Sequence, residues 1–302
     1  MRGERILVTG PTSQVGLPLV KALAADNEVY GLARLRKQAD RDTLEDIGVK
    51  PVAVDLAEDD LDSVPDDCTY VINLAVVKSG RFDYDLAANA EGVGRLMARC
   101  RAAKAFLHGS SAAVYQYTGD GPLTEDAPLG DNHRALFPTY SISKIAAETM
   151  VRFGARQWNI PTIIARFSVP YGDDGGWPCF HLAMMQAGHA IPVHPDRPNL
   201  YNLIHEEDYI AQVPALLAAA TVPATTINWG GSTAVSVEQW CEYLGELTGL
   251  EPEFEETEQT IPPLPVDVSR MREIAGPTHV DWREGMRRIV ERSGAGAGAK
   301  VG

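Results

Sequence analysis

The chain has 302 residues, of which 45% are hydrophobic and 23% charged, and its formal net charge at pH 7 is −14. This length fits one large domain or a domain with an added lobe, and the acidic balance argues against binding of nucleic acid, which needs a basic surface. No segment resembles a signal peptide or is apolar over enough residues to span a bilayer, so we expect a cytoplasmic protein that does not associate with membranes.

The first half of the chain alternates short apolar runs with segments of helical periodicity. Runs typical of buried strands lie at residues 5–9, 28–32, 51–54, 70–74, 105–108 and 162–165. Helical patterns cover residues 15–25, 84–103 and 139–158. Continuous apolar strands separated by helices are typical of a parallel sheet covered on both faces, and right-handed crossovers make such a sheet doubly wound. The sequence therefore predicts an α/β fold with a Rossmann-type, doubly wound parallel sheet.

After Gly172 the composition changes, with more Pro, Gly and aromatic residues. Two further helices are predicted at residues 207–220 and 237–248, with a short strand at 226–228 between them. We expect this part to form a smaller C-terminal substrate-binding lobe. The predicted division is a doubly wound domain over residues 1–172, the lobe over 173–292 with segments that return to the first domain, and a flexible Gly/Ala-rich tail over 293–302.

A glycine-containing turn joins the first strand to the first helix. Such a turn lets backbone N–H groups and the helix dipole face a pyrophosphate. Gly10 permits the turn, and Gly16 permits close packing of the helix on the sheet. Ser13 stands at the middle glycine of a G-x-x-G-x-x-G pattern, and its hydroxyl is a further candidate donor. The turn predicts a dinucleotide site that includes Gly10, Thr12, Ser13, Gln14, Val15 and Gly16.

The end of the second strand discriminates between the two nicotinamide dinucleotides. NAD enzymes place an acidic residue there, which binds the ribose 2′-hydroxyl. Here Ala33 takes that place, and Arg34, Arg36 and Lys37 follow. A 2′-phosphate is better tolerated without the carboxylate, so we expect NADP, with NAD as the alternative. The competing interpretation is a basic surface loop without function.

Tyr140 and Lys144 lie four residues apart on a predicted helix and therefore project from one face. Carbonyl reduction needs a proton donor beside the hydride acceptor, and a phenol serves if a neighbouring ammonium lowers its pKa. Upstream, Ser110 and Ser111 end a predicted strand at the carboxyl edge of the sheet. A hydroxyl at that edge can bind the substrate oxygen. The alternative for the Tyr–Lys pair is an exposed helical pair without function.

These segments together resemble the extended short-chain dehydrogenase/reductase superfamily, of the NAD-dependent epimerase/dehydratase kind. The resemblance rests on the N-terminal turn, the Ser-Ser-x-x-Val-Tyr segment and the Tyr-x-x-x-Lys helix, in that order, and it covers nearly the whole chain. It implies that Tyr140 passes the proton, that Ser111 orients the oxygen, and that Lys144 tunes Tyr140 and anchors the ribose. Besides Tyr140 and Lys144, it implies cofactor contacts at Asp55, Leu56, Leu74, Ala75, Val76, Phe167 and Val169.

The same resemblance bears on the reaction. Sugar-nucleotide dehydratases carry an Asp-Glu pair after the catalytic hydroxyl, where this chain has Ala112 and Ala113. Nucleotide-sugar epimerases carry an Asn at the position of Val169 and a diphosphate-binding Arg at the position of Tyr201, although Arg197 in the same loop is a candidate substitute.

We therefore expect an NAD(P)-dependent oxidoreductase that transfers a hydride between nicotinamide and a secondary alcohol or carbonyl of a small or sugar-like substrate. A nucleotide-sugar epimerase with a transient keto intermediate is the alternative. A non-catalytic dinucleotide-binding regulator is the third interpretation; relatives of that kind tend to lose the Tyr–Lys pair, which this chain keeps.

Substrate contacts are expected at Lys78, Ser111, Tyr171, Trp177, Phe180 and Tyr201. The aromatic members of this set equally fit packing in the core of the lobe. His181, His189 and His194 lack the spacing of metal ligands, so no metal is expected. The predicted helices at 84–103 and 139–158 resemble the surface through which members of the superfamily dimerise, and we expect a homodimer.

Overall fold

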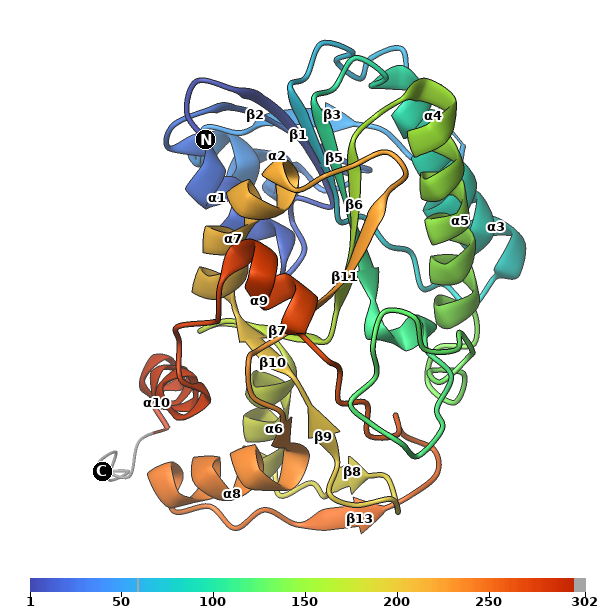
Figure 1. Ribbon diagram of the computed structural model, residues 1–302. Helices are drawn as coiled ribbons and strands as arrows, with labels where there is room; N and C mark the ends of the chain where they lie inside the picture. The colour runs from blue at the N-terminus through green and yellow to red at the C-terminus, as the bar shows by residue number, and fades with distance from the viewer. Residues whose placement is uncertain (59, 296–302) are drawn as a thin grey trace.

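The computed structural model describes residues 1–58 and 60–295. Its central sheet contains β1 (Arg5–Thr9), β2 (Glu28–Ala33), β3 (Lys50–Ala53), β4 (Tyr70–Asn73), β5 (Ala105–Ser111), β6 (Thr162–Phe167) and β11 (Thr225–Trp229). The strands are all parallel, in the order β11-β6-β5-β4-β1-β2-β3 (Figure 1). The predicted α/β fold with a doubly wound parallel sheet is confirmed.

Helices cover both faces of this sheet. One face carries α1 (Gly16–Ala24), α7 (Glu206–Ala218) and α9 (Ser269–Ala275), and the other carries α4 (Gly92–Arg99) and α5 (Tyr140–Trp158), as Figure 1 shows. Successive strand side chains point to opposite faces. Ile6 and Val8 of β1 accordingly join one hydrophobic core, whereas Leu7 joins the other. A further helix, α2 (Gln38–Asp46), connects β2 to β3.

The helix predicted over residues 84–103 is divided in the structure. Its parts are α3 (Phe82–Leu86), the π-helical turn η1 (Ala87–Glu91) and α4. Single π-helical turns inside longer helices are frequent at functional sites. Two polar side chains at this wide turn, Asp85 and Asn89, are buried and hydrogen-bond outside the helix. The spacing of apolar residues in the sequence did not indicate the wide turn. The helical segments on both sides of it place apolar residues on the sheet, as one continuous helix would.

The C-terminal part forms a smaller layer beyond the carboxyl edge of the sheet. Its helices are α6 (Trp177–Gln186), α8 (Val237–Thr248) and α10 (Trp282–Ser293). Its short strands pair as β7 (Val169–Tyr171) with β10 (Leu203–His205), β8 (Ile191–Val193) with β13 (Phe254–Glu256), and β9 (Leu200–Tyr201) with β12 (Val235–Ser236).

Two segments of the C-terminal half return to the central sheet. The strand predicted at residues 226–228 is β11, which pairs with β6, and α7 packs against α1. The range 173–292 therefore contains both the lobe and two segments, α7 and β11, that belong to the central sheet and its helices. Of the tail predicted over 293–302, residues 296–302 lie outside the described residues, and Ser293 is the last residue of α10.

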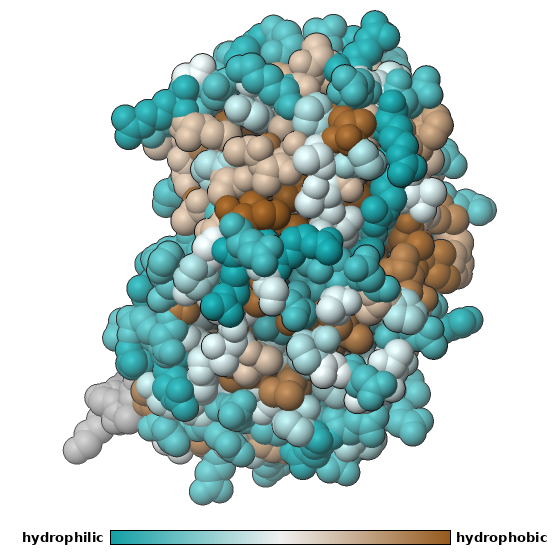
Figure 2. All heavy atoms as spheres, viewed as in Figure 1, coloured by the Kyte–Doolittle hydropathy of each residue, from teal (hydrophilic) through white to brown (hydrophobic). Residues whose placement is uncertain are grey.

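The face in Figure 2 is largely hydrophilic, in keeping with the net charge of −14, and its hydrophobic residues form separate patches. Within residues 1–58 and 60–295, no helix combines the length and apolar character that crossing a membrane requires. In the same part of the chain, no group of three or more His, Cys, Asp or Glu side chains is arranged to hold a metal ion.

A buried ion pair holds α5 on the sheet. Glu148 of α5 accepts hydrogen bonds from Nε and Nη2 of Arg166 on β6, at 2.8 and 2.7 Å, and from the Ser110 hydroxyl on β5 at 2.7 Å. The side chains of Glu148 and Arg166 are each 2% exposed. Burial raises the pKa of the Glu148 carboxyl, but the hydrogen bonds from Arg166 and Ser110 outweigh it, and the pKa lies below its usual value.

We predict that Glu148→Gln lowers the free energy of unfolding by about 3–5 kcal/mol, because it leaves the Arg166 guanidinium buried without its counter-charge. Urea denaturation measures this loss. Arg152→Ala is the matched control, since Arg152 also pairs with Glu148, at 3.1 Å, but is 39% exposed. Its removal should cost less than about 1 kcal/mol. Equal losses in the two variants would contradict the proposed weight of the buried pair.

Candidate active site

The carboxyl ends of β1 and β4 lie side by side where the strand order reverses, which is where doubly wound sheets bind their ligands. Gly10 follows β1 with a φ of +68°, and a Cβ on it would lie 3.1 Å from backbone atoms of Ala75. Gly16 begins α1, and a Cβ there would lie 2.1 Å from the Gly10 carbonyl oxygen. Any side chain at either position would displace the turn.

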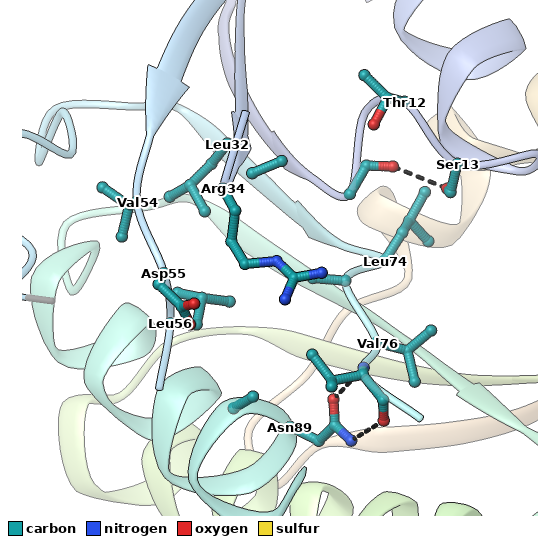
Figure 3. Close-up of a pocket in the computed structure, with 15 residues that line it drawn as sticks. Thr12, Ser13, Leu32, Arg34, Val54, Asp55, Leu56, Leu74, Val76 and Asn89 are labelled. Carbon is teal, nitrogen blue, oxygen red and sulfur yellow. Dashed lines mark hydrogen bonds between the residues drawn. The ribbon is translucent and has the colours of Figure 1, made fainter. Parts of the chain in front are cut away.

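A cavity of about 240 Å³ opens beside this turn (Figure 3). Apolar side chains of Leu32, Val54 and Leu56 form one wall, which suits the planar ring of an adenine. The glycine turn forms the other side, with Gly10, Thr12 and Ser13, where backbone N–H groups suit a diphosphate. The cavity gathers most of the predicted cofactor residues, namely Gly10, Thr12, Ser13, Arg34, Asp55, Leu56, Leu74, Ala75 and Val76.

The Ser13 hydroxyl closes the turn itself. It donates to the Gly10 carbonyl oxygen at 2.7 Å and accepts from the Gly16 N–H at 3.0 Å. The hydroxyl is therefore held within the turn, and its donation to a bound dinucleotide stays a prediction. Serine is tolerated here because the backbone at Ser13 does not have the positive φ that would favour glycine.

Arg34 extends from the end of β2 into the cavity, between Asp55 and Leu74 (Figure 3). Its Nη1 lies 3.4 Å from the Tyr84 hydroxyl, which in turn donates to Asp55 Oδ2 at 2.8 Å. Arg36 is not part of the cavity lining; its Nη2 lies 3.5 Å from Asp55 Oδ2 and its side chain is 70% exposed. A cation and a carboxylate thus both stand at this end of the cavity.

A second cavity, of about 490 Å³, shares Ser13, Leu74 and Val76 with the first and continues toward α6. It brings together predicted residues from both halves of the chain: Gln14, Val15, Lys78, Ser111, Tyr140, Lys144, Phe167, Val169, Trp177 and Phe180. Since the two cavities adjoin, a dinucleotide with its adenosine in the first would reach the second with its nicotinamide.

Tyr140, Ser111 and Lys144 meet in the second cavity. Tyr140 is the first residue of α5 and Ser111 the last of β5, both line this cavity, and the Ser111 hydroxyl is close enough to the Tyr140 phenol to contribute a lowering effect to its pKa. Lys144, one turn further along α5, donates from Nζ to the Gly109 carbonyl oxygen at 2.8 Å. Ser110 also lines the cavity, but its hydroxyl donates to Glu148, so Ser111 is the serine that faces the phenol.

Burial dominates the titration of these groups. It raises the pKa of the Tyr140 phenol, against a smaller lowering effect of Ser111. It lowers the pKa of Lys144 to about 8, opposed by Glu148 and reinforced by Lys78. We expected Lys144 to lower the pKa of Tyr140. In the structure Lys144 points to Gly109 and the phenol pKa stays above its usual value, so the protein alone does not provide that lowering.

Lys78 and His133 stand close to the phenol. Lys78 Nζ lies 5.1 Å from the centre of the Tyr140 ring and 4.5 Å from that of Phe137. The His133 ring is 5.7 Å from the Tyr140 ring, and burial, with a contribution from Lys78, lowers its pKa to about 3. His133 is therefore neutral at pH 7. Sequence reasoning missed His133, Phe137 and Ile261 in this cavity, because their loops carry no periodicity or motif.

Asp85 and Asn89, at the wide turn η1, hold the loop that carries Lys78 onto α5. Their hydrogen-bond partners are, in that loop, Val77, Ser79 and Gly80, and, at the start of α5, Thr139 and Ser143. Asp85 is fully buried, and these bonds keep the pKa of its carboxyl low despite the opposing effect of burial. Neutral hydrogen-bond donors thus stabilise the buried Asp85 carboxylate, and the same bonds fix the loop that places Lys78 near Tyr140.

Of the residues that we expected to contact substrate, Tyr171 lies in the core of the lobe, whereas Tyr201 lines a further cavity over α6 and only its hydroxyl is turned away. Tyr171 is 2% exposed and lines neither cavity; its ring packs edge-on against His205, and Gly285 leaves room for its hydroxyl. Tyr201 turns its hydroxyl inward, to the carbonyl oxygens of Ile261 and Pro262 at 2.8 and 2.9 Å. The whole side chain of Tyr171 and the hydroxyl of Tyr201 are therefore part of the core of the lobe. A buried phenol needs a hydrogen-bond partner or close apolar packing, and the core supplies them.

We predict that Lys144→Met stabilises the protein without cofactor at pH 7. The fall of the Lys144 pKa from 10.5 to about 8 corresponds to an unfavourable contribution on the order of 3 kcal/mol below pH 8. Between pH 8 and 10.5 the unfolded chain binds the proton that the folded chain has lost, so stability rises with pH. Denaturation across this range should show that rise in the wild type and lose it in Lys144→Met; an unchanged slope would contradict the assignment.

Comparison with known proteins agrees with this geometry. Residues 6–230 match the model of the NAD dependent epimerase/dehydratase family. The chain is 26% identical over 262 residues to the low-salt glycan biosynthesis protein Agl12 of Haloferax volcanii, covering 81% of this chain and 82% of that protein. It is also 26% identical over 282 residues to dTDP-glucose 4,6-dehydratase of Neisseria gonorrhoeae, covering 82% and 80%.

Among solved structures, a mutant of UDP-glucuronic acid 4-epimerase from Bacillus cereus, in complex with UDP-4-deoxy-4-fluoro-glucuronic acid and NAD, superposes with a TM-score of 0.81. The match covers 95% of this chain and 98% of that one at 19% identity, which shows a common fold. The family match spans most of the chain and includes the glycine turn, Ser111, Tyr140 and Lys144. The chain belongs to the NAD dependent epimerase/dehydratase family.

Proposed function

We propose that this protein is an NAD(P)-dependent enzyme that transfers a hydride at a secondary alcohol or carbonyl carbon, with Tyr140, Ser111 and Lys144 as its catalytic residues. The observation that carries the proposal is that these three side chains line one cavity, and that this cavity adjoins the slot beside the glycine turn. Neither cavity alone would support the reaction, since hydride transfer needs cofactor and substrate side by side.

The roles of the three residues follow from their positions. In the oxidising direction, the Tyr140 phenolate takes the hydroxyl proton of the substrate as the carbonyl forms, and in the reducing direction the phenol returns it. Ser111 hydrogen-bonds the same oxygen and shares its developing charge. Lys144, buried at the side of the cavity, holds the ribose. The dinucleotide supplies the hydride acceptor or donor and, when oxidised, a positive charge that favours the phenolate.

For the net reaction, the comparisons favour epimerisation over the net oxidoreductase that we expected first. The solved structure is a sugar 4-epimerase, and an enzyme of that kind recycles its cofactor within one turnover. Dehydration is less well supported, because no Asp or Glu lies among the described residues that line the second cavity, and Ala112 and Ala113 follow Ser111. An acid–base pair for removing water is therefore not at hand in this part of the chain.

A net dehydrogenase or reductase is the second candidate. It is favoured by the inward-turned hydroxyl of Tyr201 and by Val169, which stands in the second cavity where an epimerase of nucleotide sugars carries an Asn. The two reactions separate in one assay with substrate. An epimerase leaves the absorbance of reduced nicotinamide unchanged over many turnovers, whereas a net oxidoreductase changes it in step with product.

We also propose a homodimer through α4 and α5, since α5 exposes apolar side chains such as Ile142 and Phe153. Long helices of this kind commonly pair in symmetric dimers. Cytoplasmic localisation stays a prediction from the sequence.

Tyr140→Phe should lower kcat by roughly 100- to 10,000-fold, because it removes the proton carrier. Dinucleotide binding, followed by fluorescence titration, should be unchanged, since the phenol oxygen faces the substrate. Tyr243→Phe is the matched control. Tyr243 lies on α8, away from both cavities, and its hydroxyl accepts a hydrogen bond from Arg287 of α10. Turnover that survives in Tyr140→Phe would remove Tyr140 from the mechanism.

The preference for NADP is proposed on the position of Arg34. A guanidinium that binds a 2′-phosphate contributes about 1.5–3 kcal/mol, so wild type should bind NADPH at least roughly tenfold more tightly than NADH. Arg34→Ala should erase this preference. Arg36→Ala should retain it, because Arg36 lies outside the cavity lining. Tighter binding of NADH by wild type would instead assign the ribose to Asp55 and Tyr84, in agreement with the NAD in the solved relative.

A further inference from the structure

A third cavity, of about 220 Å³, extends the second one outward over α6. The two share Phe137, Trp177, Phe180 and Ile261, so a molecule that reacts at Tyr140 can continue into it. Leu136 and Phe180 stand at its rim and are 46% and 60% exposed. A substrate therefore has one reacting end in the second cavity and one non-reacting end in this outer cavity.

The lining of the outer cavity carries no charge. None of the described residues that form it is an Asp, Glu, Lys or Arg. Its one ionisable base, His181, stacks on Trp240 and accepts a hydrogen bond from the Trp240 Nε1–H at 2.9 Å on Nδ1. Burial lowers the pKa of His181 to about 4, so the ring is neutral at pH 7.

Besides His181, the outer cavity has three polar side chains, and two of them, Tyr201 and Asn199, are engaged within the protein; the third is Thr260. The Tyr201 hydroxyl donates to backbone carbonyls, as described above. Asn199 accepts the His194 N–H at 2.7 Å and donates to the His194 carbonyl oxygen at 2.9 Å. A phosphate in this cavity would lose its hydration and gain no cation; Tyr201 and Asn199 already have partners, and Thr260 offers one neutral hydroxyl, so binding an anion there is costly.

Arg197 does not offer the missing charge. Its Nε lies 3.0 Å from Glu238 and its Nη1 3.3 Å from Glu256, and it is not among the residues that line the outer cavity. Turning it inward would break both ion pairs. Arg197, whose place in the sequence made it a candidate for binding a diphosphate, is thus held by Glu238 and Glu256 instead.

We propose that the outer cavity binds an uncharged, apolar part of the substrate, an aryl or alkyl group, in the place of a nucleoside diphosphate. A cavity of about 150 Å³ lined by apolar side chains is enough for a benzene molecule, so about 220 Å³ suits a group of this size. The proposal rests on the proposed function, because the outer cavity is reached through the site of hydride transfer. It holds equally for an epimerase and for a net oxidoreductase.

The test uses the full-length protein loaded with dinucleotide. The probes are methyl ketones from 2-pentanone to 2-nonanone, 4-phenyl-2-butanone and UDP-glucose. Binding is measured by calorimetry, hydride transfer from reduced dinucleotide to the ketones by nicotinamide absorbance, and turnover of UDP-glucose by separation of its products. Each added methylene should tighten binding about three- to fourfold while the chain still enters the cavity. UDP-glucose should bind at least roughly tenfold more weakly than 4-phenyl-2-butanone.

A pair of variants locates the effect. Phe180→Asp puts a carboxylate at the rim of the outer cavity and should weaken binding of 4-phenyl-2-butanone at least roughly tenfold. Val222→Asp changes an exposed apolar residue after α7, outside this cavity, and should leave binding unchanged. Both positions are partly exposed, so folding should survive, and circular dichroism checks it.

The outcomes separate this inference from the proposed function. Tighter binding of UDP-glucose, ketone binding that ignores chain length, or no ketone binding would each overturn the apolar substrate class. Turnover of UDP-glucose that depends on Tyr140 would overturn it and keep the proposed function. Ketones that bind with the expected dependence on chain length and on Phe180, but never exchange a hydride with the dinucleotide, would keep the inference and overturn the function.

Discussion

The geometry of the candidate site depends on the buried pair of Glu148 and Arg166. Glu148 bonds to β5 through Ser110 and to β6 through Arg166, so it fixes α5 along its axis against two strands at once. Lys144 and Tyr140 lie one and about two turns before Glu148 on the same helix, and Ser111 follows Ser110 directly. A shift of α5 by a single turn, about 5.4 Å, would separate the phenol from the serine.

The second constraint is the burial of the Lys144 ammonium. Lys144 is 4% exposed and lacks an ion pair with the carboxylate nearest along its helix, Glu148, whose oxygens are taken by Arg166, Arg152 and Ser110. Burying this ammonium destabilises the folded protein, so selection for stability alone would not retain it. It is consistent with a residue kept for binding or catalysis, where a pKa shifted by burial is useful.

The sequence predicted the sheet and its helices because a parallel sheet leaves continuous apolar runs, and it predicted the glycine turn because only small residues fit between β1 and α1. Other features have no local signature. The place of β11 in the sheet depends on a crossover from the distant α7, and His133 and Ile261 reach the second cavity only through tertiary packing. Tyr171 was misplaced because a core aromatic and a ligand-binding aromatic have the same sequence pattern.

Charge is divided unequally between the cavities of this chain. Three cations, Arg34, Lys78 and Lys144, lie where a cofactor and a reacting oxygen would bind. Beyond Phe137 and Trp177, the lining of the outer cavity contains no Lys or Arg among the described residues. An anion that bound beyond these two rings would have to be held without a cation in a protein of net charge −14. The fold is therefore informative about the hydride chemistry, whereas the identity of the substrate depends on the few side chains of the outer cavity.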